Sequence, residues 1–167
     1  MAVTSTSITR PFSDSYLLSY SAEHVAYEID MFFWLARHSS AALAAPTAAD
    51  AGRLSNVLIE ASVIHLRNII DFLYLDKPKA TDVVATDFFA SNVWDSLRPP
   101  ITPSLDAARI RANKEIAHLT TDRMAGSPPA KAWDFQTFAN EIKPLLHLVA
   151  TRALSSRLSP TVARAIP

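Results

Sequence analysis

Glycine is almost absent from this 167-residue chain, which contains only Gly52 and Gly126. Phosphate-binding loops of the Walker and Rossmann types need several closely spaced glycines, so neither kind of nucleotide site can be built here. Two-residue β-hairpin turns also depend on glycine, which disfavours a fold with many strands. Since alanine- and leucine-rich amphipathic stretches fill the sequence, the composition predicts an all-α protein.

The charges of the chain balance, with 16 basic and 16 acidic residues. This balance argues against a broad cationic surface for nucleic acid but leaves room for a small basic pocket. Cysteine is absent, which excludes disulfides, thiolate metal sites and cysteine nucleophiles. No apolar stretch has the 18 or more uncharged residues that a membrane span requires. We therefore expect a cytoplasmic protein with no membrane contact.

The length suits one domain with a complete core. Residues 1–15 are rich in Ser and Thr and are predicted to form a disordered leader. Residues 16–156 are predicted to form a single helical-bundle domain, and residues 157–167 a flexible tail.

Four stretches with apolar residues at helical spacing predict the long helices, namely residues 19–44, 48–75, 103–121 and 134–154. Pro46 ends the first stretch, and Thr47 and Thr102 are the caps expected for the second and third. Residues 81–98 predict one or two short helices that cross the bundle between the second and third long helices. The predicted buried face of the first stretch comprises Tyr27, Met31, Phe32, Phe33, Trp34 and Leu35. Together these elements predict a four-to-five-helix bundle.

A polar stripe runs along the third predicted helix through Arg111, Glu115 and His118. The seven-residue interval between Arg111 and His118 is two helical turns, so their side chains share one face about 10 Å apart along the axis. Stripes of this kind are most often solvated faces joined by ion pairs, each worth a few tenths of a kcal/mol.

The stretch from Arg111 to Thr120 contains an Arg-x6-His pattern with Asn113 and Lys114 inside it. This pattern, on a late helix of a small glycine-poor bundle, resembles the signature of HEPN domains (higher eukaryotes and prokaryotes nucleotide-binding), and the resemblance extends over residues 20–155. It implies a metal-independent endoribonuclease or an RNA- or nucleotide-binding module of a prokaryotic defence or toxin–antitoxin system. It also implies a homodimer, an antitoxin-type protein partner and no cofactor.

On this resemblance Arg111 and His118 are the candidate catalytic residues. A histidine that titrates near neutral pH can take a proton from a 2′-hydroxyl or give one to the leaving oxygen. An arginine can bind a phosphate through two parallel hydrogen bonds. Asn113, Lys114 and Glu115 are the supporting residues that we expect on the same helix.

The second predicted helix sets four polar residues on or beside an apolar stripe, namely His65, Arg67, Asn68 and Asp71. Buried polar groups of this kind usually bond to one another or to a neighbouring helix end. The functional alternative is that Asp71 or Glu60 orients the arginine or histidine of the third helix, with the other three residues in support.

Two other functional classes stay open at this point. A non-catalytic interaction module would keep the fold and lose the activity. A metal-binding bundle would use one histidine from each long helix, namely His24, His65, His118 and His147. Only His118 has a Glu three residues before it, so a ferritin-like di-iron site is excluded, and we predict no bound metal.

Overall fold

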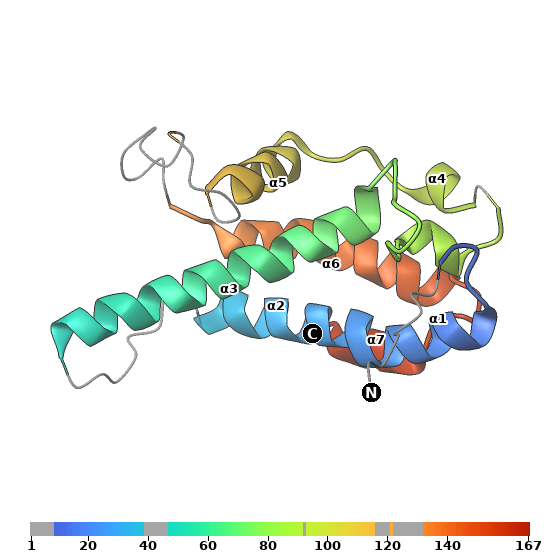
Figure 1. The fold of residues 1–167 in the computed structure, drawn as a ribbon, viewed down its shortest axis with the longest axis horizontal. Coiled ribbons are helices and arrows are strands. Elements are labelled where there is room, and N and C mark those ends of the chain that lie inside the picture. Colours follow the sequence, from blue (N-terminus) through green and yellow to red (C-terminus); the bar gives the residue numbers. More distant parts are fainter. Residues whose placement is uncertain (1–8, 39–46, 92, 116–120, 122–131) are drawn as a thin grey trace, which may run out of the picture.

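Helices are the regular elements of the structure (Figure 1). The computed structural model describes residues 9–38, 47–91, 93–115, 121 and 132–167. These residues contain no β-strand, so the all-α prediction is confirmed for them. No helix found in these ranges combines the length and the apolar character that a membrane crossing requires.

The first arm of the fold is one continuous run of helix. It consists of α1 (Asp14–Tyr20), a π-helical turn η1 (Ser21–Val25) and α2 (Ala26–His38). Ser13 caps the start, because its side chain accepts a hydrogen bond from the Tyr16 amide at 3.2 Å.

The arm therefore begins inside the segment that was predicted as a disordered leader. That prediction is wrong for residues 9–15, since Phe12 is buried and Arg10 forms an ion pair with Asp87 at 2.6 Å. Residues 1–8 lie outside the described part of the chain.

The buried face of α2 differs from the predicted one. Tyr27 and Trp34 were expected in the core, but they are 53% and 44% exposed. Phe32, Phe33 and Leu35 are buried as predicted. Val25, Ile29 and Ala36 complete the buried face and form with Phe32 a series at intervals of four and three. The prediction is therefore wrong for the two exposed aromatic residues.

The second long helix, α3 (Ala48–Tyr74), matches the predicted stretch closely. Thr47 caps it as expected, accepting a hydrogen bond from the Asp50 amide at 3.1 Å. α3 runs antiparallel to α2, and its N-terminal part extends past the rest of the bundle (Figure 1). Its buried residues all lie from Ser62 onward.

Two short helical segments follow α3, as predicted. They are the 3₁₀ helix η2 (Ala85–Phe88) and α4 (Val93–Leu97). α5 (Pro103–Glu115) then begins at the predicted proline, and the Thr102 hydroxyl accepts a hydrogen bond from the Leu105 amide at 3.2 Å.

The last elements are α6 (Phe135–Arg152) and α7 (Pro160–Ala165). The predicted flexible tail is therefore wrong. Leu158, Val162 and Ile166 are buried at helical spacing, and α7 packs against α2 and α6. Burial of this apolar stripe holds the segment in place, and the Ser159 side chain caps the helix.

The core lies around α3 and α6, with α2 and α7 on one side and α5 on the other (Figure 1). It contains large side chains that are almost completely buried, among them Phe32, Leu66, Phe88, Trp94 and Ile142. The indole Nε1 of Trp94 donates a hydrogen bond to the Leu73 carbonyl at 3.0 Å, so this polar group is satisfied within the core.

Candidate functional site

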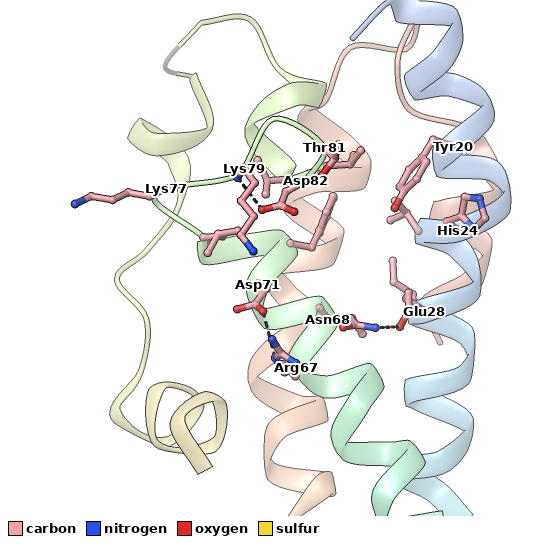
Figure 2. Close-up of a pocket in the computed structure, with 17 residues that line it drawn as sticks. Tyr20, His24, Glu28, Arg67, Asn68, Asp71, Lys77, Lys79, Thr81 and Asp82 are labelled. Carbon is pink, nitrogen blue, oxygen red and sulfur yellow. Dashed lines mark hydrogen bonds and ion pairs between the residues drawn. The ribbon is translucent and has the colours of Figure 1, made fainter. Parts of the chain in front are cut away.

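A cleft of about 570 Å³ opens between the first helical arm and the C-terminal part of α3 (Figure 2). One wall carries Tyr20, His24 and Glu28, and the α3 wall carries Arg67, Asn68 and Asp71. The volume is within the range of small-molecule sites in proteins. Three of the four polar residues that were singled out on α3 therefore face a single cavity.

The segment that follows α3 closes one end of this cleft. Pro78 cannot continue the helix, and the chain turns back at this point. The turn is held by the Lys79 amide, which donates to Asp82 Oδ2 at 2.7 Å. In Figure 2 the Lys79 side chain is directed into the cleft, whereas Lys77 points away from it.

Glu28 links the two walls below the cleft. Its Oε2 accepts hydrogen bonds from His65 Nδ1 at 2.7 Å and from Asn68 Nδ2 at 3.1 Å. His65 is 9% exposed, so this bond satisfies a buried ring nitrogen. The structure supports the prediction that polar groups on α3 bond to a neighbouring helix. The sequence reasoning missed Glu28 as the partner, although a Glu within an apolar stretch was a usable signal.

Asp71 lies opposite the first arm and faces Arg67 along the same helix. Asp71 Oδ2 and Arg67 Nε are 3.6 Å apart, which is an ion pair without a hydrogen bond. Burial raises the pKa of the Asp71 carboxyl above its ordinary value, while Arg67 and Arg109 of α5 oppose the rise. A carboxyl in a cleft with a raised pKa is a recognised marker of a functional site.

The carboxylates of the cleft already interact with this chain, whereas two of its cations have donors to spare. Glu28 accepts two hydrogen bonds, and Asp82 accepts one from a backbone amide. The Nε of Arg67 is buried without a hydrogen bond. The Lys79 ammonium has no hydrogen-bond or ion-pair partner among the residues described. The donors of the site that lack a hydrogen bond therefore include cationic ones.

The predicted residues of α5 form a separate cluster. Arg111 Nε donates to Glu115 Oε1 at 2.8 Å, and its Nη1 donates to the Ala132 carbonyl at 3.0 Å. The Arg111 guanidinium carbon also lies 4.0 Å from the centre of the Trp133 ring. These contacts join the end of α5 to the start of α6, and Arg111 does not line the cleft.

The structure describes two of the other predicted residues of this helix but not the third. Asn113 is half-buried and Lys114 is exposed, both within α5. His118, the second candidate catalytic residue, lies outside the described residues. Its position relative to Arg111 therefore stays a prediction.

In the described ranges, no group of three or more His, Asp or Glu side chains is placed to hold a metal ion. The metal-binding alternative therefore has no support there. His24 lies on the rim of the cleft and His65 bonds to Glu28, so these two histidines do not share a site.

The comparisons with known proteins leave the family open. No family model, no curated protein and no solved structure matches the chain. The resemblance to HEPN domains thus stays a prediction.

Proposed function

We propose that this protein is an RNA- or nucleotide-binding domain of the HEPN-like kind, and that its cleft holds a phosphate group of the ligand. The observation that carries the proposal is the pair of cations Arg67 and Lys79 at the cleft. Arg67 makes a 3.6 Å ion pair with Asp71 but its Nε has no hydrogen bond among the described residues, whereas Glu28 and Asp82 already accept hydrogen bonds from this chain. An anion is the partner that satisfies such donors best.

The two cations suit a phosphate in complementary ways. Arg67 offers a planar set of N–H donors for two oxygens, and Lys79 adds a point charge from the closing turn. A partly enclosed cavity also strengthens these interactions, because the effective dielectric constant there is lower than in water. The zero net charge of the chain is compatible with a local site of this kind.

Ribonuclease activity through Arg111 and His118 remains part of this proposal, together with the homodimer and the antitoxin-type partner that the resemblance implies. A non-catalytic interaction module is the second candidate, and the contacts of Arg111 favour it. A guanidinium already bonded to Glu115, Ala132 and Trp133 would have to give up those contacts to grip a phosphate.

Binding measurements test the proposed site directly. Wild-type protein is titrated with a labelled single-stranded RNA and with mononucleotides in EDTA. We expect Arg67→Ala and Lys79→Ala each to weaken binding by about 10- to 150-fold, since a charge-assisted hydrogen bond contributes roughly 1.5–3 kcal/mol. Arg53→Ala is the matched control, because Arg53 is an exposed arginine on the same helix that does not line the cleft.

Two outcomes would contradict the proposal. One is a wild-type protein that binds neither RNA nor nucleotide at millimolar concentration. The other is an equal loss of affinity in the Arg53 and Arg67 variants. Incubation of RNA with the wild type and with His118→Ala in EDTA decides separately between catalysis and binding alone, since only a catalytic site loses cleavage with this residue.

A further inference from the structure

Aromatic rings repeat at every fourth residue from Phe12, just before the first helical arm, to His24 within it. We call this series of four rings the ladder. Ring centres are 5.3 Å apart between Phe12 and Tyr16, 5.8 Å between Tyr16 and Tyr20, and 4.7 Å between Tyr20 and His24. Contacts of this kind fill a core in most proteins. Here the ladder ends at the cleft, where Tyr20 and His24 are lining residues and the two earlier rings are not.

The π-helical turn lies at the point where the ladder meets the cleft. It includes His24 and follows Tyr20 directly. Turns of this type are rare and occur often at functional sites, because they change the direction in which side chains project. The turn is fixed by the fully buried Ser21, whose hydroxyl donates to the Leu18 carbonyl at 3.0 Å and accepts from the Ser159 amide at 2.9 Å.

Tyr20 is the ring of the ladder that reaches into the cavity. In Figure 2 its hydroxyl end points into the cleft, with His24 beside it on the arm. No described residue hydrogen-bonds to that hydroxyl. Burial raises the pKa of the Tyr20 phenol, which therefore stays a neutral O–H donor at physiological pH. Ile29, Ile69 and Phe72 add apolar surface around it.

The cationic donors lie across the cavity from this ring. Arg67 is on α3 and Lys79 is on the closing turn, whereas Tyr20 is on the first arm (Figure 2). A ligand with a flat apolar part at one end and an anionic part at the other would complement both walls.

We infer that Tyr20, backed by His24, is a stacking surface for one nucleobase, so that the cleft binds a nucleotide unit rather than a bare phosphate or a sugar phosphate. This inference rests on the proposed function, because it takes the phosphate to lie at Arg67 and Lys79. Stacking on an aromatic side chain contributes about tenfold or more to affinity per base and tolerates any base. The site therefore selects for the presence of a base more than for its identity.

Calorimetry with matched ligands tests the inference. Wild-type protein is titrated with AMP, CMP, ribose 5-phosphate and inorganic phosphate. We expect both nucleotides to bind at least about tenfold more tightly than ribose 5-phosphate. An RNA pentamer should likewise bind more tightly than the same pentamer with abasic positions.

Variants of the ladder assign the effect to one ring. Tyr20→Leu should remove most of the advantage of AMP over ribose 5-phosphate, whereas Tyr20→Phe keeps the ring and should retain that advantage. Tyr16→Leu is the matched control, because Tyr16, like Tyr20, contacts two rings of the ladder but does not line the cleft. Thermal melts of all three variants establish that each is folded.

The possible results separate this inference from the function on which it rests. Equal affinity for AMP and ribose 5-phosphate, both weakened by Arg67→Ala, overturns the stacking surface and leaves the phosphate site standing. Equal loss of the AMP advantage in the Tyr16 and Tyr20 variants also overturns it. Absence of binding by every phosphate-bearing ligand overturns the proposed function itself.

Discussion

Asp71 is the residue whose protonation couples the cleft to pH. Its pKa in the folded protein is raised, chiefly by burial, so folding disfavours the ionised carboxylate. The stabilising contribution of such a group is present below its unfolded pKa. It is lost as the pH rises through the raised pKa of the folded state.

Asp71→Asn removes this titration. We expect the melting temperature of the variant, relative to the wild type, to increase as the pH rises from about 3.5 to about 6, because only the wild type must bury a charge over that window. Differential scanning fluorimetry across this range measures the difference directly. A difference that stays constant with pH would show that Asp71 titrates normally.

Glu28 is the residue that satisfies two side chains of α3 at once. We expect Glu28→Ala to lower the free energy of unfolding by about 1–3 kcal/mol, because the buried His65 ring loses its partner. Glu28→Gln keeps one acceptor oxygen and should cost less. Urea denaturation gives the values, with the exposed Glu23→Ala on the same arm as the control. Equal stability of the Ala variants at positions 23 and 28 would contradict this role.

At the scale of single residues, the sequence shows which polar side chains interrupt the apolar face of α3. It does not show which residues they bond to. Arg67, Asn68 and Asp71 were singled out on α3 as polar residues within an apolar helix, and all three line the cleft. Helical spacing within α3 could not identify Glu28, which lies about 40 positions earlier on another helix. Partners of that kind depend on how two helices pack, which one helix does not encode.

At the scale of the elements, the join between α5 and α6 depends on Arg111. We expect Arg111→Ala to destabilise the protein by about 1 kcal/mol, since it loses a cation–π contact with Trp133 and a helical ion pair with Glu115. Arg111→Lys keeps the charge but not the flat stacked group, so it should recover only part of the loss.

Measurements of denaturation and of RNA cleavage together show whether the role of Arg111 is structural or catalytic. The exposed Arg53→Ala is the control and should change stability by less than about 0.5 kcal/mol. If Arg111→Ala is as stable as that control but abolishes cleavage, Arg111 is a catalytic residue rather than a structural one.

Elements that begin at a strong cap were the ones that could be predicted. α3 begins after Thr47, and α5 begins after Thr102 with a proline in its first turn, as the sequence indicated. The π-helical turn could not be predicted, because Ser21 stabilises it through a contact with Ser159, 138 positions along the chain. α7 was missed for a different reason: its stripe of Leu158, Val162 and Ile166 is short and lies at the end of the sequence.

At the scale of the whole molecule, the balanced charge makes a prediction about salt. A protein that binds nucleic acid over a broad cationic face releases many counterions, whereas a single cleft with two cations releases few. We expect the logarithm of RNA affinity to fall with the logarithm of salt concentration with a slope of about −0.7 to −1.5, which corresponds to one or two phosphates. Fluorescence anisotropy at several salt concentrations measures the slope. A slope steeper than about −4 would indicate a broad surface outside the cleft.

α3 begins outside the bundle and ends inside it, with its buried residues confined to the part from Ser62 to Tyr74. A helix built in this way should not open as a unit, because tertiary contacts protect only one of its halves. Amide hydrogens between Leu54 and Glu60 should therefore exchange with deuterium quickly, and those between Leu66 and Leu73 only through global unfolding. Mass-spectrometric exchange would then trace a steep gradient of protection within a single helix, with the cleft residues at its slow end.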